Sequence, residues 1–246
     1  FGRALRYRAR VTFGGYGGRE RLAGFPALLF ISPSTFEGFD YAQCAADGSD
    51  LRFADENGVI LPYEIDTWNT NGTSLVWVRL PVLAPEGASA WMGWGSTRHP
   101  LPATPASCET WRDYAAVWHF GEASGTARDS GPFGFDAVPM GETAADCVGT
   151  NIITLGVSRY IPAGCHFEAG SWGKIAIGSA LSASGWFHMT SHQTGQSPLF
   201  FSNKVHYDDT YGWYMAVQES ASSVSANGGG GGHATSEGQI GRSLTA

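Results

Sequence analysis

The residues best placed for chemistry are two carboxylates in the stretch LPYEIDTWNTNG, residues 61–72. Alternation of polar and apolar residues predicts a β-strand here, and alternate side chains of a strand share one face of the sheet. Glu64, Asp66 and Trp68 are therefore expected on one face, with the residues between them on the other. Two carboxyl groups about 5–5.5 Å apart can hydrolyse a glycosidic bond, one as nucleophile and the other as proton donor.

The strand lacks the second half of that chemistry. Its residue order resembles the Glu-x-Asp-x-x-Glu signature of laminarinase-type glycoside hydrolases, in which the final Glu is the proton donor. Asn69 occupies that position here, and an amide cannot deliver a proton to a leaving oxygen at neutral pH. Neither a Gly-x-Ser-x-Gly turn nor a His-Glu-x-x-His helix offers other chemistry. We therefore expect no catalytic residues, and the chain is predicted not to be an enzyme.

A second candidate site is the loop in NKVHYDDTYGW, where Tyr207 and Tyr211 flank Asp208 and Asp209. Flat aromatic faces and carboxylates that accept hydrogen bonds from hydroxyls are typical of sugar-binding loops, and carboxylates also bind calcium. These four residues are the predicted ligand-binding residues, and calcium is the cofactor that such a loop would take. The alternative is a solvent-exposed turn, because Asp and Gly form turns without any ligand.

The four cysteines are Cys44, Cys108, Cys147 and Cys165. They form no Cys-x-x-Cys pair, which argues against a zinc site, and four cysteines allow three pairings. We predict that Cys147 pairs with Cys165 across a Gly- and Pro-rich segment, and that Cys44 pairs with Cys108 if the chain between them folds back. Free buried thiols are the alternative. Disulfides would indicate an oxidising compartment outside the cytosol.

Charge and hydropathy limit the classes of partner. The chain has 15 Lys and Arg against 22 Asp and Glu, a formal net charge of −7, so a nucleic-acid-binding protein is not expected. The arginines of GRALRYRAR, residues 2–10, are explained by a charged strand edge that blocks unwanted pairing. No apolar run reaches the 18 or more residues of a transmembrane helix, so no membrane span is expected.

The elements that must position these residues are strands. Period-two alternation dominates a chain of 246 residues with 34 glycines, and turn residues such as GGYGG and NTNG separate the segments. This pattern predicts an all-β fold of two tandem β-sandwich or jelly-roll-like domains, with Trp77, Trp118 and Trp186 in their cores. The Pro-rich stretch GSTRHPLPATPASCE marks the boundary between the domains. The predicted organisation is a first domain at 1–96, a linker at 97–111 and a second domain at 112–246.

Two resemblances follow from the order of these motifs. The motifs YRARVTF, FPALLFI, DGSDLRFADENG, LPYEIDTWNTNGTSLVWVRLPVL and WMGWG resemble the bacterial domain-of-unknown-function 2341 family over about residues 5–96. The motifs VWHFGEASGTARDSGPFGFDA, LSASGWFHMTS, LFFSNK and GWYMAVQES resemble the laminin-G/concanavalin A-like sandwich, which often follows the first family in large exported bacterial proteins. The closing Trp-His-His segment of that sandwich does not follow, so the second domain is expected to be incomplete.

Together the resemblances imply a non-catalytic glycan-binding or adhesion segment of a larger exported, surface-associated bacterial protein. Its localisation would be extracellular or at the cell surface, and its partner a polysaccharide or glycoconjugate. One alternative is a structural spacer, or a subunit of a surface assembly that contacts copies of itself or neighbouring domains. The other alternative is an accessory region of a glycoside hydrolase.

Overall fold

The structure is a computed structural model with two compact units, Phe1–Ile175 and Ala176–Ala246. It describes residues 3–150, 157–170, 182–188, 199–202, 213–217, 223–228 and 240–243. Every strand pairing in these residues is antiparallel, and the helical elements are 3-10 turns of three to five residues. The predicted all-β class is therefore confirmed. Among the described residues, no helix has the length and apolar character that crossing a membrane requires.

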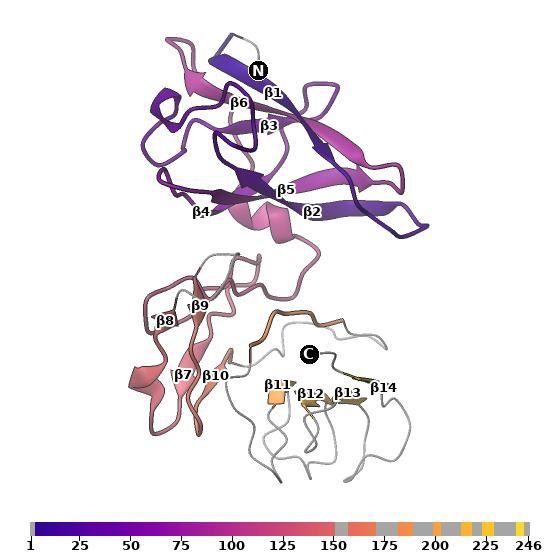
Figure 1. Ribbon diagram of the computed structural model, residues 1–246, viewed down its shortest axis with the longest axis vertical. Coiled ribbons are helices and arrows are strands. Elements are labelled where there is room, and N and C mark those ends of the chain that lie inside the picture. The colour runs from indigo at the N-terminus through magenta and orange to yellow at the C-terminus, as the bar shows by residue number, and fades with distance from the viewer. Residues whose placement is uncertain are drawn as a thin grey trace. The chain divides into compact units, whose positions relative to one another are not determined.

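The first unit begins with a β-sandwich of two three-stranded sheets, drawn in indigo to magenta in Figure 1. One sheet has the order β1-β6-β3, and the other has the order β2-β5-β4. The strands of the first sheet are β1 (Leu5–Phe13), β6 (Ala88–Ser96) and β3 (Arg52–Ala54). The strands of the second sheet are β2 (Leu22–Ile31), β5 (Ser74–Leu83) and β4 (Tyr63–Thr67).

Both sheets contribute alternate side chains to one apolar core between them. Val11 and Met92 come from the first sheet, while Val76, Val78 and Leu80 come from β5, and all five side chains are almost fully buried. β-branched and long aliphatic side chains suit the pleated inner faces of packed sheets. Along each strand, the side chains that the sequence pattern predicted to alternate thus point in turn to the core and to the outer face.

The predicted linker, residues 97–111, does not run free of the sandwich. Its second half forms the 3-10 helix η2 (Ser107–Trp111), which packs against β4 and β5. Thr110 and Trp111 are buried there. Earlier in the segment, the carbonyl of Pro102 accepts a hydrogen bond from Arg52 Nε at 2.7 Å. The boundaries 1–96, 97–111 and 112–246 stay a prediction, while η2 forms part of the first unit.

After η2, the described residues of the first unit form short strands joined by longer connections. β7 (Val138–Met140) pairs with β10 (His166–Glu168), and β8 (Gly149–Thr150) pairs with β9 (Ser158–Arg159). A third 3-10 turn, η3 (Ala144–Asp146), precedes β8. With so few ladder hydrogen bonds, this region depends on side chains that bond to the backbone.

In its described residues, the second unit has a four-stranded antiparallel sheet of order β11-β12-β13-β14. Its strands are β11 (Leu199–Ser202), β12 (Trp213–Val217), β13 (Ser223–Gly228) and β14 (Ile240–Ser243). A laminin-G/concanavalin A-like domain stays a prediction. The candidate ligand loop with Tyr207, Asp208, Asp209 and Tyr211 lies outside the described residues.

The three tryptophans predicted as core residues have different environments. Trp77 lies on the outer face of β5, where its ring centroid is 5.0 Å from that of Trp111. Trp118 is half-buried, and its Nε1 donates a 2.7 Å hydrogen bond to the carbonyl of Phe135. The prediction is wrong for Trp186, which is 92% exposed in a segment without regular structure. Apolar alternation there does not correspond to a paired strand.

No disulfide bond is present: all four cysteines are free thiols. Burial, together with the nearby carboxylates of Asp50 and Asp40, raises the pKa of the Cys44 thiol to about 12. Cys147 is buried, and its Sγ lies 3.0 Å from the Sγ of Cys165, beyond the bonding distance of about 2.05 Å. The structure thus places one predicted pair side by side as thiols, and its oxidation stays a prediction.

Candidate functional site

The two carboxylates of the opening motif share the outer face of β4. Tyr63 and Ile65 point the other way and pack against the sandwich core, while Glu64 and Asp66 line a cavity on the outside. Alternation along the strand is the cause. The sequence therefore placed these two carboxylates correctly with respect to each other.

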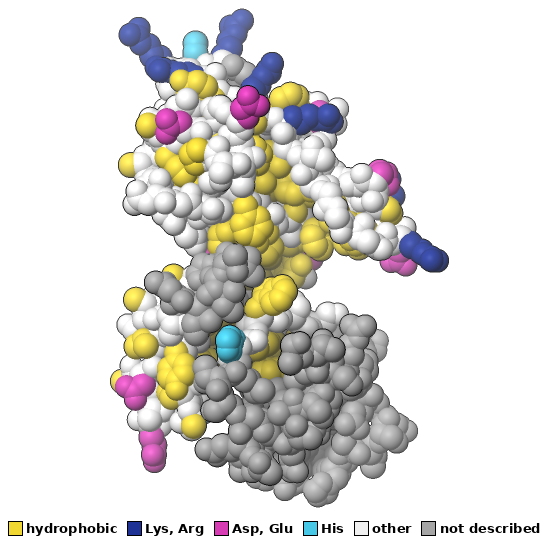
Figure 2. Space-filling view, in the orientation of Figure 1, with side chains coloured by type: hydrophobic (Ala, Val, Ile, Leu, Met, Phe, Trp, Pro, Cys, Tyr) yellow, Lys and Arg dark blue, Asp and Glu magenta, His cyan; other side chains and the backbone are white. Residues whose placement is uncertain are grey.

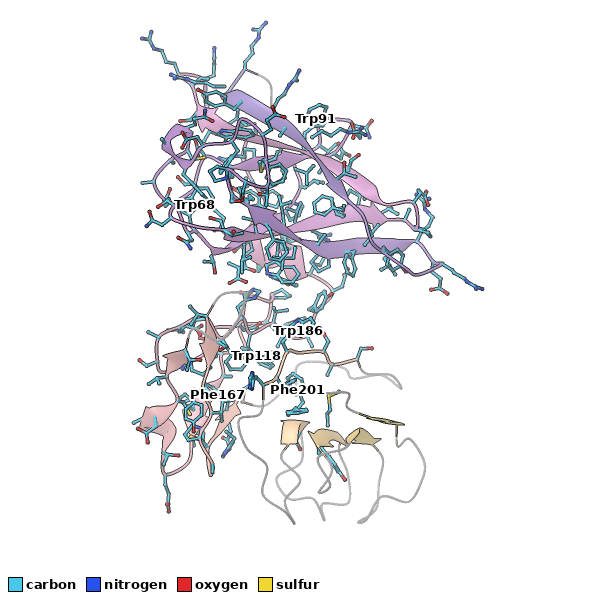
Figure 3. All side chains as sticks on the ribbon, viewed as in Figure 1. Trp68, Trp91, Trp118, Phe167, Trp186 and Phe201 are labelled. Atoms are coloured by element: carbon cyan, nitrogen blue, oxygen red, sulfur yellow. The ribbon has the colours of Figure 1, made fainter. Side chains whose placement is uncertain are left out.

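Trp68 does not share that face, and its predicted position is wrong. The pairing of β4 with β5 shifts register between Ile65 and Thr67, as it does at a β-bulge. An extra residue reverses the alternation beyond it. Trp68, labelled in Figure 3, therefore packs against the core and meets Tyr41 edge to face at 5.1 Å. Thr67 joins the carboxylates at the cavity instead.

Glu64 connects β4 to three residues that are distant in sequence. Its Oε2 accepts hydrogen bonds from the indole Nε1 of Trp111 and, at 3.1 Å, from His119 Nε2. Its Oε1 accepts a 2.6 Å hydrogen bond from the hydroxyl of Ser130. The three partners lie 47, 55 and 66 residues further along the chain. Glu64 thus holds the segment after η2 against the outer face of the sheet.

His119 bridges the two carboxylates. Its Nδ1 lies 3.4 Å from Asp66 Oδ2, which also accepts a 3.3 Å hydrogen bond from the indole of Trp77. The imidazole lies against two indole rings, with centroid distances of 5.5 Å to Trp111 and 6.1 Å to Trp77. We call Glu64, Asp66, His119 and Ser130 the Glu64 cluster.

The backbone next to His119 is strained. Phe120 has φ 55°, in the left-handed region that a bulky residue adopts at a cost of about 1–3 kcal/mol. Its ring meets Phe167 edge to face at 5.2 Å, a contact that helps to hold this conformation. Such strain persists only where surrounding contacts impose it.

The surroundings of Glu64 and His119 favour the charged form of each side chain. Burial opposes the charge on Glu64, but hydrogen bonds from His119, Ser130 and Trp111 hold the pKa of its carboxyl below the ordinary value. Burial also opposes the charge on His119, whereas the hydrogen bond to Glu64 and the charge of Asp66 raise its pKa overall. Each shift favours the charged form of that group.

The Glu64 cluster borders a polar cavity of about 280 Å³. Its other charged groups are Glu122, which pairs with Arg159 at 3.2 Å, and Arg128, which pairs with Asp136. In the ranges that the structure describes, no three His, Cys, Asp or Glu side chains are arranged to hold a metal ion. The cavity is lined by Glu64, Ile65, Asp66, Thr67, His119, Gly121, Glu122, Arg128, Ser130 and Val157.

This arrangement suits hydrogen bonding better than acid catalysis. A carboxylic acid that protonates a leaving group needs a raised pKa, whereas Glu64 is held as a carboxylate that accepts three hydrogen bonds. Asn69, which replaces the signature's final Glu, accepts a 3.1 Å hydrogen bond from the amide of Asn71 in the turn that follows β4. The cavity instead offers oxygens and a guanidinium to a polar ligand.

Sequence reasoning missed three members of the site. Trp111 was the last residue of the predicted linker, and His119 and Ser130 belonged to motifs assigned to the second domain. No fixed spacing relates them to Glu64, because the approach of the segment to β4 depends on η2. The sequence signal for these residues is that Trp, His and Ser lie close together in a stretch that we had assigned to the strands of the second domain.

Comparison with known protein families supports the first of the two resemblances, for part of the chain. Residues 47–131 match the family model described as Domain of unknown function (DUF2341). The match begins later than the resemblance in the sequence and extends past the predicted linker, so that it includes every member of the Glu64 cluster, together with Trp77 and Trp111. No curated protein and no solved structure matches the chain.

Proposed function

We propose that the first unit is a non-catalytic binding module that takes a saccharide in the cavity beside the Glu64 cluster. The chain would then be the glycan-binding or adhesion segment of a larger exported, surface-associated bacterial protein. The observation that carries this proposal is the cavity itself, in which ionised side chains of both signs are held in place by mutual hydrogen bonds.

A neutral, hydroxyl-rich ligand fits this mixture of groups. Sugar hydroxyls donate to the carboxylates of Asp66 and Glu122 and accept from the guanidinium of Arg128, without bringing a net charge that either sign would repel. Val157 gives the cavity a small apolar surface for the C–H face of a sugar ring. A volume of about 280 Å³ is close to the lower end of ligand-sized cavities, so one or two sugar units would fill it.

The test starts with a glycan array probed with the intact chain, followed by titration calorimetry with the strongest hit. Asp66→Asn and Glu122→Gln remove acceptors with full charge while keeping shape, and we expect each to weaken binding by about tenfold or more. Glu142→Gln is the matched control, because Glu142 is exposed and does not line the cavity. Unchanged affinity in both cavity variants would refute this site.

The second domain supports a finer version of the same proposal. On the resemblance of its motifs, residues 112–246 would form a concanavalin A/laminin-G-like sandwich, with Tyr207, Asp208, Asp209 and Tyr211 as a ligand loop that takes calcium. Replacing both tyrosines by Ala should then weaken glycan binding, and chelation should reproduce the effect of Asp208→Asn with Asp209→Asn. Glycan binding that survives both treatments would assign recognition to the first unit alone.

A structural spacer is the second candidate. Its support is that Glu64 joins β4, η2 and the Ser130 turn, so the same residues that border the cavity also attach the segment after the sandwich. For a spacer, Glu64→Gln should lower the free energy of unfolding while the array detects no ligand for either protein. A reproducible glycan hit would decide against this candidate.

A further inference from the structure

The outer face of β1 carries a row of arginines. Arg6, Arg8 and Arg10 alternate with residues that turn inward, such as Val11 and Phe13 at the far end of the strand, and all three arginines are exposed. Alternate residues of an antiparallel strand are about 6.8 Å apart. The row is therefore a line of positive charges on one face of the sandwich, on the sheet opposite to the one that carries the Glu64 cluster.

Strand pairing brings two further arginines to the end of β1 where this row begins. Leu5 of β1 pairs with Ser96 of β6. The next residue, Thr97, donates two hydrogen bonds of 2.9 Å to the start of the chain. Its amide donates to the carbonyl of Ala4, and its hydroxyl donates to the carbonyl of Arg3. Exposed Arg98 and His99 follow directly. Figure 2 shows dark-blue side chains gathered at this end of the sandwich, around one cyan histidine. We call Arg3, Arg6, Arg8 and Arg98 the arginine face.

The arginine face is not neutralised by its surroundings. Arg10 pairs with Glu56 at 2.9 Å, but within the described residues none of the four arginines of the face makes an ion pair. Asp50 is close to the end of β6, yet it is buried and accepts hydrogen bonds from the amides of Gly95 and Ser96. A chain with formal charge −7 thus concentrates unpaired positive charge at one place.

Trp91, labelled in Figure 3, lies under this row on β6. The guanidinium carbon of Arg8 is 5.3 Å from its ring centroid, a cation–π contact, and its indole nitrogen donates to Glu56 at 3.2 Å. The indole is thereby covered on one face, while the guanidinium of Arg8 stays exposed and is held in position. A fixed guanidinium loses less side-chain entropy when it binds an anion.

We propose that the arginine face binds an acidic polysaccharide, a polymer with carboxylate or sulfate groups along its length. Guanidinium groups pair with these groups through two parallel hydrogen bonds, and a row of them fits repeating charges. Single-stranded nucleic acid is disfavoured because it needs open aromatic faces for base stacking, and Trp91 is capped by Arg8. Protection of the strand edge explains charge on β1, but it does not explain the further exposed arginine, Arg98, that follows β6 beside the start of β1.

The experiment measures binding of the full chain to sodium polygalacturonate, with neutral dextran as the uncharged polymer. We expect binding to polygalacturonate that weakens as salt rises, whereas any binding of dextran in the cavity beside the Glu64 cluster should not depend on salt. Arg6→Gln with Arg8→Gln should weaken it roughly tenfold, as expected for the loss of two exposed charge pairs. The matched control is Arg19→Gln with Arg21→Gln, which removes the same charge from the exposed β1–β2 connection at the far end of β1.

The outcomes separate this proposal from the others. Equal weakening by both double variants would reduce the effect to net charge and overturn the proposal, as would tighter binding to a single-stranded DNA oligonucleotide or to anionic vesicles than to polygalacturonate. Circular dichroism checks that the exposed substitutions leave the fold intact. The salt-sensitive part of polygalacturonate binding should depend on Arg6 and Arg8, and any salt-independent saccharide binding should depend on Asp66, so failure of the saccharide cavity and failure of the arginine face are distinguishable.

Discussion

The sandwich of β1–β6 and the described residues that follow it, 112–150 and 157–170, are stabilised by different interactions. The sandwich buries side chains such as Phe53, Ile31 and Leu51 completely between two sheets. The following region has strands of two or three residues and is organised by polar side chains that bond to the backbone. Hydrophobic burial is insensitive to pH, whereas ion pairs and carboxylate acceptors are not. The two regions should therefore respond differently to mutation, pH and oxidation.

The largest expected effect is in the sandwich core. Phe53→Ala removes a side chain with no exposed surface, so it loses transfer free energy and leaves a cavity, lowering the free energy of unfolding by about 3–5 kcal/mol. Urea denaturation measures this, with Val82→Ala at a position 37% exposed as the control. A loss under about 1 kcal/mol would mean that the core is not the main support of the sandwich.

Oxidation of Cys147 and Cys165 to a disulfide should stabilise the residues after the sandwich, and not the sandwich itself. A bond between Cys147 and Cys165 would close a loop of 18 residues and add roughly 3 kcal/mol in the chain-entropy model, less any strain. Peptide mapping without reductant, on protein from an oxidising compartment, detects the bond, and Cys165→Ser is the control. Four free thiols in that protein would contradict the pairing and weaken the proposal that the chain is exported.

In the residues after the sandwich, a single carboxylate should contribute as much to stability as a buried apolar side chain does in the sandwich. Asp129 accepts hydrogen bonds from the amides of Val117, Gly131 and Phe135 at 2.7–2.8 Å. Asp129→Ala leaves these amides without that acceptor, at a cost of about 1–3 kcal/mol for each one that water does not reach. Hydrogen exchange should speed up in residues 112–137 while the sandwich strands stay protected. Equal loss of protection in both regions would remove the distinction between them.

The smallest expected effect is a pH dependence of the Glu64 cluster. The lowered pKa of Glu64 contributes stability that is present above its ordinary value of 4.5 and is lost as pH falls through the folded value. The raised pKa of His119 contributes stability that is present below 6.5 and is lost as pH rises through its folded value. Attachment of the segment to β4 should therefore be strongest between these two values. Tryptophan fluorescence against pH, taken as the difference between the protein and Trp111→Phe, reports on Trp111, and His119→Gln should abolish the loss at higher pH.

The sequence alone determined the features that depend on neighbouring residues. Alternation predicted the strands and placed Glu64 and Asp66 together, since successive side chains of a strand point to opposite faces whatever the sheet contains. It could not place Trp68, because the shift between Ile65 and Thr67 depends on how β4 pairs with β5. The residue pattern of one strand does not predict a bulge that depends on its pairing with another strand.

Only the tertiary structure decided the partners of Glu64 and the neighbours of the arginine row. Trp111, His119 and Ser130 reach Glu64 because η2 packs on the sheet, and Arg98 reaches β1 because β6 runs antiparallel to it. Contacts between residues about 50 to 90 positions apart are set by which packing buries the most apolar surface, a property of the whole chain. The residue types that could do chemistry could be identified from the sequence, whereas their arrangement into sites depends on the tertiary structure.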